Sequence, residues 1–234
     1  MLDSCIIIPS RWGSQRFPGK PLIPIVGKTM VKRVLERGLQ SSADTVIVAT
    51  DDEKIFEECE GYSMMTGDLP NGTARVIEAA KKISARVYVN LQGDEPLASP
   101  EDLNKLIQKC QQMPGVHTLM TSISENELSN INVVKVFCDD ENECWLFTRS
   151  AFNLGCNKHI GIYAFDRETL SKIEHLNPTP NALTENLEQI TWLDHEIPIY
   201  AWYTAHKYQA VDSFEDVQKV IEILNEDSLH HPNV

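Results

Sequence analysis

The sequence contains no apolar run that approaches the roughly 18 residues of a membrane-spanning helix. Its first residues, MLDSCIII, lack a cationic segment and a long apolar core, so no secretory signal is predicted. The six cysteines form no CxxC pair and no regular framework, which argues against a zinc site or a disulfide scaffold. Basic residues are scarce, 21 against 34 acidic ones, and the net charge of −13 has the wrong sign for binding nucleic-acid phosphates. We therefore expect a cytoplasmic protein that neither binds nucleic acid nor inserts into a membrane.

Acidic residues are absent from one stretch, between Asp3 and Glu36, although the chain as a whole is acidic. This stretch holds six of the 21 basic residues: Arg11, Arg16, Lys20, Lys28, Lys32 and Arg33. The last three fall in a helical pattern, where a solvated basic face explains them. The first three stand in a loop with two glycines and two prolines, within IIIPSRWGSQRFPGKPL. A cationic loop in an anionic protein indicates a site for a small, highly charged anion, and a purely structural loop is the alternative.

Short apolar segments rich in β-branched residues alternate with helical patterns along the chain. The predicted strands are 4–9, 45–50, 85–91, 118–124, 133–137, 144–148, 159–165 and 197–203. The predicted helices are 29–40, 52–60, 73–83, 100–112, 167–174, 185–194 and 213–225. This alternation predicts right-handed crossovers and an α/β fold with a doubly wound, mainly parallel sheet. We expect a single domain over 1–234, allow for a small inserted lobe within about 113–205, and expect a frayed tail from residue 227.

The cationic loop follows the first predicted strand directly. In open parallel sheets, ligands bind outside the carboxyl ends of the strands, near the point where the strand order reverses, so this loop stands where a nucleotide would bind. Neither GxxxxGK[ST] nor GxGxxG is present, which argues against a P-loop and a dinucleotide fingerprint. Arg11 and Arg16 can make planar, multi-donor contacts with phosphate or carboxylate, and Lys20 can place a mobile point charge on a phosphate.

Two aspartates are candidate Mg²⁺ ligands. Asp94 follows the third predicted strand, in NLQGDEP, and Mg²⁺ typically takes one or two carboxylates while water and substrate phosphates fill its other positions. A turn with a solvated aspartate is the alternative. Asp212, in AVDSFEDV, is the candidate for a second carboxylate, but it precedes a predicted helix, and an N-cap role for Asp212 or Ser213 competes.

The segment NKHIGIYAF carries a polar pair. His159 and Tyr163 are four residues apart, so on a strand they face the same side of the sheet, while the two isoleucines between them face the other side. Such a wall suits a polyol, and a half-buried histidine with a satisfied hydrogen bond is the alternative. Glu188 and Gln189 interrupt an apolar helical stretch, where a solvated helix face is the default explanation.

Taken together, these motifs resemble the 3-deoxy-manno-octulosonate (Kdo) cytidylyltransferases, also called CMP-Kdo synthetases. Eight motifs occur in the order of that family: IIIPSRWGSQRFPGKPL, ATDDE (49–53), NGTAR (71–75), NLQGDEP (90–96), TRS (148–150), KHIGIY (158–163), LEQ (187–189) and AVDSFED (210–216). The resemblance runs from residue 5 to about residue 224. One such motif is weak evidence, but eight in order are strong.

The resemblance implies two binding sites and a Mg²⁺ cofactor. The residues implied for CTP are Ser10, Arg11, Ser14, Lys20, Asn71, Arg75 and Gln92. The residues implied for the sugar acid are Arg16, Gln92, Arg149, His159, Tyr163, Glu188 and Gln189. Asp94 and Asp212 would hold Mg²⁺ and, with Lys20, would be the catalytic residues.

The reaction implied by the resemblance transfers CMP from CTP to the anomeric hydroxyl of a 3-deoxy-2-ulosonic acid, Kdo above all, and releases pyrophosphate. The product would supply activated sugar for lipopolysaccharide or capsule. Such a transfer requires positioning and charge neutralisation more than covalent catalysis. The resemblance also implies a nucleotide-diphospho-sugar transferase fold and a homodimer.

The sequence departs from the family pattern at three places. The loop has Ser10 where the family has Ala and Gln15 where it has Thr, and NGTAR replaces SGTDR. Only nine residues (150–158) separate Arg149 from His159, where the family has a longer segment. This short segment leaves two alternatives open: a related acid, such as 8-amino-Kdo or a nonulosonic acid, and a non-catalytic homologue that binds nucleotide sugars.

Overall fold

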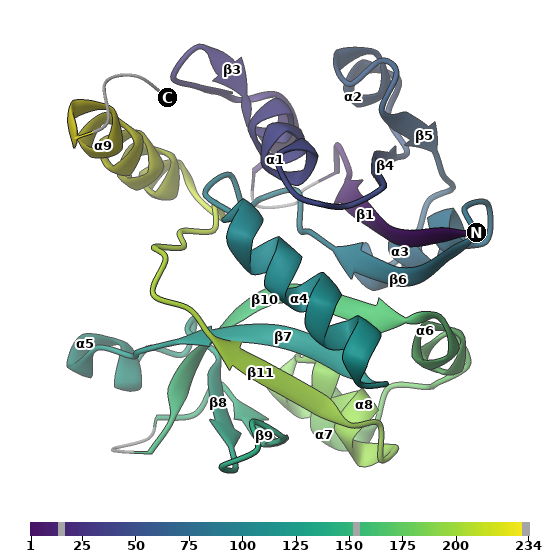
Figure 1. The fold of residues 1–234 in the computed structure, drawn as a ribbon. Coiled ribbons are helices and arrows are strands. Elements are labelled where there is room, and N and C mark those ends of the chain that lie inside the picture. Colours follow the sequence, from purple (N-terminus) through teal and green to yellow (C-terminus); the bar gives the residue numbers. More distant parts are fainter. Residues whose placement is uncertain (14–16, 152–154, 231–234) are drawn as a thin grey trace.

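The computed structural model describes residues 1–13, 17–151 and 155–230. Its centre is a nine-stranded sheet whose main path has the order β11-β7-β10-β6-β1-β4-β5, as Figure 1 shows. These seven strands are β1 (Leu2–Ser10), β4 (Thr45–Thr50), β5 (Ser63–Met65), β6 (Ala85–Asn90), β7 (Val116–Thr121), β10 (Asn157–Asp166) and β11 (Ile199–Tyr203). Off this path, β8 (Lys135–Cys138) pairs with β10 and with β9 (Cys144–Thr148).

Helices connect most of these strands. They are α1 (Met30–Leu39), α2 (Glu53–Glu58), α3 (Gly72–Ala80), α4 (Pro100–Gln112), α5 (Glu125–Leu128), α6 (Arg167–Ile173), α7 (Pro180–Glu185), α8 (Glu188–Asp194) and α9 (Phe214–His230). The first loop ends in a 3-10 turn, η1 (Lys20–Leu22), and a hairpin of β2 (Pro24–Ile25) and β3 (Lys28–Thr29). Among the described residues, no helix is long and apolar enough to cross a membrane.

The strand order reverses beside β1. This strand pairs in parallel with β4 on one side and with β6 on the other. The chain therefore leaves β1 through α1 to reach β4, and returns through α3 to the opposite side. The predicted doubly wound α/β fold is confirmed, and the loop after β1 lies at the switch point where such sheets bind ligands. One strand inside the main path, β10, runs antiparallel to both of its neighbours, so the sheet is mixed although mostly parallel.

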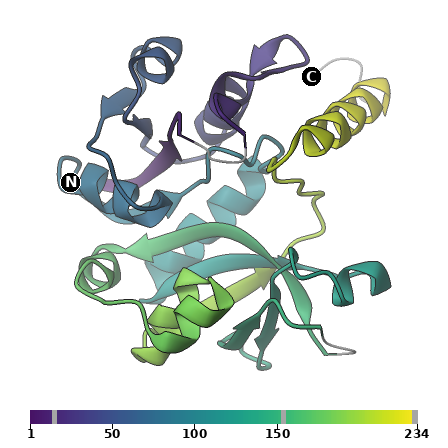
Figure 2. The ribbon, with the colours of Figure 1, turned by 180° about the vertical axis from the view of Figure 1, so that it is seen from behind.

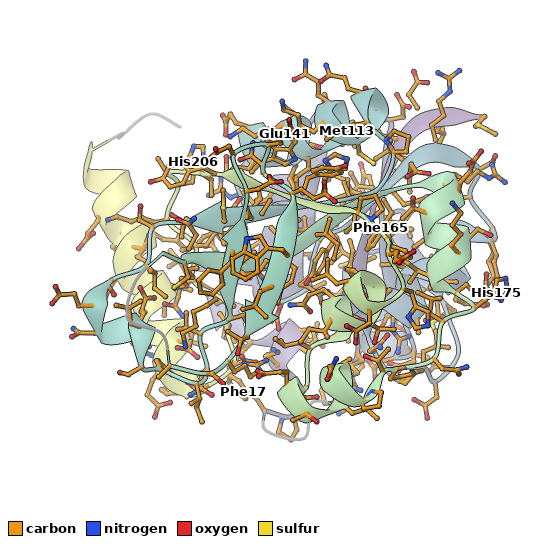
Figure 3. The ribbon with its side chains drawn as sticks, turned by 90° about the horizontal axis from the view of Figure 1, so that it is seen from below. Phe17, Met113, Glu141, Phe165, His175 and His206 are labelled. Carbon is orange, nitrogen blue, oxygen red and sulfur yellow. The ribbon has the colours of Figure 1, made fainter. Side chains whose placement is uncertain are left out.

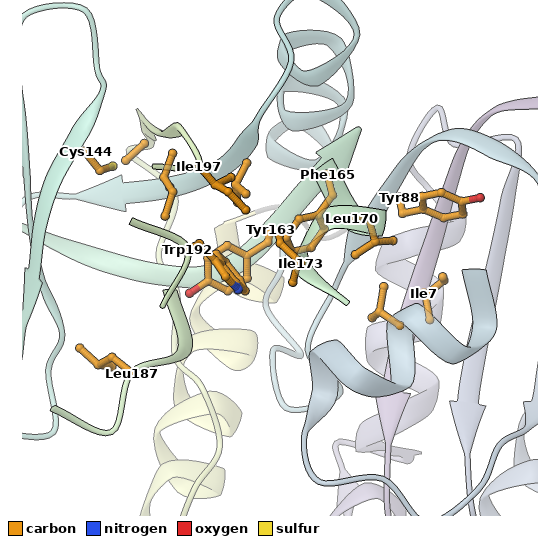
Figure 4. Packing of buried hydrophobic residues seen from close by; sticks show 14 of the residues in the cluster. Ile7, Tyr88, Cys144, Tyr163, Phe165, Leu170, Ile173, Leu187, Trp192 and Ile197 are labelled. Carbon is orange, nitrogen blue, oxygen red and sulfur yellow. The ribbon is translucent and has the colours of Figure 1, made fainter. Parts of the chain in front are cut away.

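Side chains that alternate along each strand build a core on either face of the sheet. Ile6 and Ile8 pack with α1, α2 and α4, whereas Cys5 and Ile7 belong to the core under α3, α6, α7 and α8. Figure 2, seen from behind relative to Figure 1, shows the face of the sheet that α3, α6, α7 and α8 cover. In that core the Trp192 ring stands edge-on to two aromatic rings of β10, with centroids 5.1 and 5.5 Å apart, and Figure 4 shows this packing.

The helix predicted over 185–194 is confirmed over most of its length as α8, which begins only at Glu188 because Asn186 adopts a left-handed conformation (φ 52°) that ends α7. The prediction for the tail is wrong in part. Of the residues expected to fray from 227, residues 227–230 continue α9, whereas 231–234 lie outside the described residues. Helix α7 was not predicted, and neither were the β2–β3 hairpin, β5 and α5, whose two to four residues are too few to show a periodic pattern.

Candidate active site

Two cavities lie where β1 and β6 end. The smaller, of about 540 Å³, is lined by residues of the loops after these strands and of the start of α3. The larger, of about 1810 Å³, is lined by β10, α8 and the segment before α9. Gln92, Asp94 and Asp212 line both cavities, so the two spaces meet at these three side chains.

The smaller cavity gathers the described residues that the resemblance implies for CTP. They are Ser10, Arg11, Lys20, Asn71, Arg75 and Gln92, whereas Ser14 lies outside the described residues. Ser10 is buried, and its Oγ has no hydrogen-bond partner among the described residues. A Cβ at Gly93 would stand 2.5 Å from this Oγ and 2.8 Å from the Pro9 carbonyl oxygen, so only glycine lets the two loops approach this closely.

Two of these residues, Arg75 and Asn71, form hydrogen bonds within the protein. The Arg75 guanidinium is buried and donates to Asp51 at 2.7 Å, to the Gly67 carbonyl at 3.2 Å and to the Thr66 hydroxyl. Asn71 caps α3, because its Oδ1 accepts a hydrogen bond from an amide of the first helical turn at 2.8 Å. Both residues therefore shape the wall of the smaller cavity.

A lysine and two aspartates converge where the cavities meet. Lys20 Nζ donates to Asp94 Oδ2 and to the Val211 carbonyl, both at 2.8 Å, and lies 3.7 Å from Asp212 Oδ1. The N-cap role that competed for Asp212 falls to Ser213, whose Oγ accepts the amide of the residue three positions later at 3.4 Å. The Asp212 carboxylate is therefore not the cap of α9.

The two carboxylates fit a shared divalent cation. Each lies within 4 Å of one cationic atom, Lys20 Nζ, so both can face the same positive charge. In the part of the chain that the structure describes, no group of three or more His, Cys, Asp or Glu side chains could hold a metal ion. A Mg²⁺ ion held by these two carboxylates would complete its coordination with water and phosphate, which is how it usually binds.

The larger cavity gathers the residues implied for the sugar acid. They are Gln92, Arg149, His159, Tyr163, Glu188 and Gln189, whereas Arg16 lies outside the described residues. The rings of His159 and Tyr163 lie on the same side of β10, with centroids 5.5 Å apart. Ile160 and Ile162 pack in the opposite core, so the predicted facing of these four side chains is confirmed.

A hydrogen-bond network fixes the protonation of His159. The Thr118 Oγ1 lies 3.0 and 2.8 Å from the carbonyl oxygens of Ile160 and Ile162 and 2.9 Å from His159 Nε2. Because its single hydrogen is directed to these carbonyls, the hydroxyl accepts from His159 Nε2. The proton is thereby assigned to Nε2, and Nδ1 has no hydrogen-bond partner among the described residues. Burial, reinforced by Arg149, lowers the pKa of His159 to about 3. The imidazole is therefore neutral and offers one acceptor.

This burial makes the free energy of unfolding depend on pH. The unfolded chain binds a proton at this histidine below its ordinary pKa of 6.5, whereas the folded chain does so only near 3, so stability falls as the pH falls through that window. His159→Gln is expected to remove a loss of about 2 kcal/mol between about pH 7 and about pH 5, measured by urea unfolding. His175→Gln, at an exposed position (Figure 3), should keep the wild-type slope. Parallel profiles for His159→Gln and wild type would contradict the assignment.

Several supporting residues were missed by sequence reasoning. The Thr73 hydroxyl donates to the carboxylate of Glu188 at 2.7 Å, and burial raises the pKa of that carboxyl. Buried Lys135 donates to the Arg149 carbonyl at 3.2 Å, and Glu185 accepts from the Arg149 amide at 2.8 Å. These partners come from segments that are distant in the sequence, so no local sequence pattern predicts them.

Glu95 was also missed, although it stands inside the NLQGDEP motif. It is 6% exposed, and its Oε2 has no hydrogen-bond partner among the described residues. Burial raises the pKa of Glu95 to about 8, and the neighbouring charges of Asp94 and Asp212 add to the shift. The residue lines the larger cavity beside the two aspartates.

A cationic cavity that meets a polar one at two carboxylates can hold the phosphates of a nucleotide against a second substrate. On the switch point of a doubly wound sheet, this arrangement is that of a nucleotidyltransferase. Comparison with known proteins identifies the family within this class. A family model described as "Cytidylyltransferase" matches residues 5–200, and the chain belongs to this family.

Individual relatives and solved structures support this family assignment. The chain is 38% identical to a 3-deoxy-manno-octulosonate cytidylyltransferase of Zea mays, over 92% of this chain and 78% of the relative. It is 36% identical to the Escherichia coli protein of the same name, over 94% and 95% of the two chains. Among solved structures, CMP:2-keto-3-deoxy-manno-octonic acid synthetase complexed with CTP superposes with a TM-score of 0.92 at 34% identity, covering 96% of this chain and 99% of that one. A glucose-1-phosphate thymidylyltransferase of Bacillus anthracis, 12% identical with a TM-score of 0.72, shares the fold.

Proposed function

We propose that this chain transfers CMP from CTP to the anomeric hydroxyl of Kdo in the cytoplasm, with Mg²⁺ as cofactor and pyrophosphate as the second product. The activated sugar would serve lipopolysaccharide synthesis. The observation that carries the proposal is the border that the two cavities share at Gln92, Asp94 and Asp212. The names of the relatives, and the CTP in the similar solved structure, support it.

On the nucleotide side, Arg11 and Lys20 would neutralise the triphosphate. Ser10 Oγ would satisfy its hydrogen bond on CTP, and Asn71, Arg75 and Gln92 would line the nucleoside end of the cavity. Ser14, in the same loop, would take the CTP-binding role that the resemblance implies.

On the sugar side, Arg149 would pair with the carboxylate of the acid. The neutral His159 would accept a hydroxyl hydrogen bond at Nδ1, as its network with Thr118 requires. Tyr163, Glu188 and Gln189 would contact the remaining hydroxyls. The resemblance adds Arg16 to this pocket.

In the proposed step the anomeric oxygen attacks the α-phosphorus of CTP in line. The new oxygen–phosphorus bond forms as the bond between the α-phosphorus and the oxygen that bridges it to the β-phosphate breaks. Pyrophosphate leaves with the electron pair of that bond, and the hydroxyl proton passes to solvent. Asp94 and Asp212 would hold Mg²⁺, which would supply Lewis-acid polarisation of the phosphate and would lower the pKa of the attacking hydroxyl. Lys20 stabilises the charge that grows on the phosphates.

The proposal is tested by measuring pyrophosphate release from CTP with Mg²⁺ and, in parallel, Kdo, 8-amino-Kdo or N-acetylneuraminate. We expect release with Kdo, none with neuraminate, and loss of release when the metal is chelated. Release only with another acid would keep the reaction and assign specificity to the short segment 150–158. No release with any acid, despite CTP binding, would favour a non-catalytic homologue. The homodimer implied by the resemblance is part of the proposal, and light scattering after size exclusion measures it.

Ser10 provides a sharper test of the nucleotide site. Ser10→Ala removes a hydroxyl that has no hydrogen-bond partner among the described residues, so folding should be unaffected. If that hydroxyl binds CTP, the KM for CTP is expected to rise about threefold to tenfold, as for the loss of one hydrogen bond of about 1 kcal/mol. Ser4→Ala, a buried serine at the start of the same strand, is the matched control and should leave this KM unchanged. An unchanged KM in both variants would remove Ser10 from the site.

A further inference from the structure

The segment 204–213 delivers Asp212 to the active site. It joins β11 to α9 and, in the described structure, contains neither helix nor strand. Figure 1 shows α9 standing apart from the main sheet, and its core contacts are with β2, the start of α1 and Leu97. The place of the Asp212 carboxylate therefore depends on what holds this segment.

One buried carboxylate holds the first half of the segment. Asp102, in the first turn of α4, is 2% exposed, and its Oδ2 accepts hydrogen bonds from Thr204 Oγ1 at 2.6 Å and from the Tyr208 hydroxyl at 3.0 Å. His206 Nδ1 lies 3.0 Å from the same oxygen, and Figure 3 shows His206 at the outer edge of the molecule. A carboxylate that gathers three groups of one irregular segment fixes that segment strongly.

Asp102 is not required as the cap of α4. Ser99 fills that role, since its Oγ accepts the Asp102 amide at 3.4 Å. The Ser99 amide in turn donates to the Tyr208 hydroxyl at 3.2 Å. Tyr208 is therefore tied at once to the start of α4 and to the Asp102 carboxylate.

The second half of the segment is held by Asp216 of α9, whose Oδ2 accepts the Asp212 amide at 3.2 Å, and at the catalytic residues. The Val211 amide donates to the Asp94 carbonyl at 3.0 Å, and the Val211 carbonyl accepts from Lys20 Nζ at 2.8 Å. Tyr208 stands three residues before Val211 and four before Asp212. Loosening the tie at Tyr208 therefore leaves the chain before Asp212 held mainly by the two hydrogen bonds of Val211.

We infer that Asp102 and Tyr208 are positioning residues, which hold segment 204–213 so that the Asp212 carboxylate faces Asp94. The inference rests on the proposed function, because that function requires the Asp94 and Asp212 carboxylates to hold a cation together. Tyr208 lines the larger cavity, but its hydroxyl is bound to Asp102 and to the Ser99 amide. Both act through the backbone between Tyr208 and Asp212.

Two conservative variants test the inference. Tyr208→Phe keeps the ring and removes the hydroxyl, and Asp102→Asn keeps the shape and removes the charge. Hydrogen exchange at the Val211 amide is expected to quicken at least about tenfold in each, while exchange in β1 and β6 stays at the wild-type rate. Binding of Mn²⁺ in the presence of CTP is measured by electron paramagnetic resonance. The Kd for Mn²⁺ is expected to rise about threefold to tenfold in each variant. In Asp102→Asn, whose altered residue lines neither cavity, the KM for Kdo should change by less than about twofold.

Thr169→Val is the matched structural control. It removes a partly buried side-chain hydrogen bond of 2.6 Å to Asp166 at the start of α6, and neither residue lines either cavity. It should lose unfolding free energy but keep the wild-type Val211 exchange and Mn²⁺ affinity. Tyr208→Phe and Asp102→Asn variants that behave like this control would overturn the inference. Wild-type protein that binds no Mn²⁺ would instead refute the metal part of the proposed function, and the Val211 exchange would then decide the inference by itself.

Discussion

Asp94→Asn is expected to lower kcat about 10²-fold to 10³-fold, the range seen when one preorganised electrostatic group is removed from an active site. The substitution keeps the shape of the side chain but removes the negative charge that lies 2.8 Å from Lys20 Nζ. An amide is also a poorer ligand for Mg²⁺ than a carboxylate, so the Mg²⁺ concentration needed for half-maximal rate should rise. The measurement is kcat at saturating CTP and Kdo over a series of Mg²⁺ concentrations.

Asp52→Asn is the control for this experiment. Asp52 caps α2 through its carboxylate, which accepts two backbone amides at 2.9 and 3.1 Å, and it lines neither cavity. Its variant should lose some unfolding free energy and keep the wild-type Mg²⁺ dependence. Unchanged turnover in Asp94→Asn, with wild-type stability, would remove Asp94 from the reaction.

The sequence predicts much of the candidate site because the signals for it are local. An apolar strand followed by a glycine-containing cationic loop predicts both the first strand and the anion site at its carboxyl end. The same reasoning places Asp94 one loop away, after β6, and the parallel pairing of β1 and β6 then brings the two loops together. The alternation within β10 assigns His159 and Tyr163 to one face without reference to any other strand.

What the sequence does not predict depends on contacts between distant segments. Thr118, which fixes the tautomer of His159, is 41 residues away from it, and Thr73 is 115 residues from Glu188. Packing also decides between roles that local sequence leaves open, as when Ser213 caps α9. The antiparallel direction of β10 is a further example, since a strand has the same side-chain pattern in either direction.

Lys20→Met is expected to have two effects of opposite sign. It should lower kcat by about 10²-fold to 10³-fold, because the positive charge that neutralises the phosphates is lost. It should also tighten the binding of Mn²⁺ in the absence of CTP. In the wild-type protein, Lys20 Nζ stands 2.8 Å from Asp94 and 3.7 Å from Asp212, where it competes with a cation for both carboxylates. Steady-state kinetics measures the first effect and electron paramagnetic resonance of Mn²⁺ the second.

Lys28→Met serves as the control, since Lys28 is an exposed lysine that pairs with Glu36 at 2.7 Å outside both cavities. It should change neither kcat nor Mn²⁺ affinity. Weaker Mn²⁺ binding in Lys20→Met would show that the lysine supports the cation site instead of competing for it, and an unchanged kcat would exclude its role on the phosphates. A variant that merely misfolds loses both activity and metal binding. Lost turnover together with tighter Mn²⁺ binding therefore requires a folded site in which the ammonium group and the metal share two carboxylates.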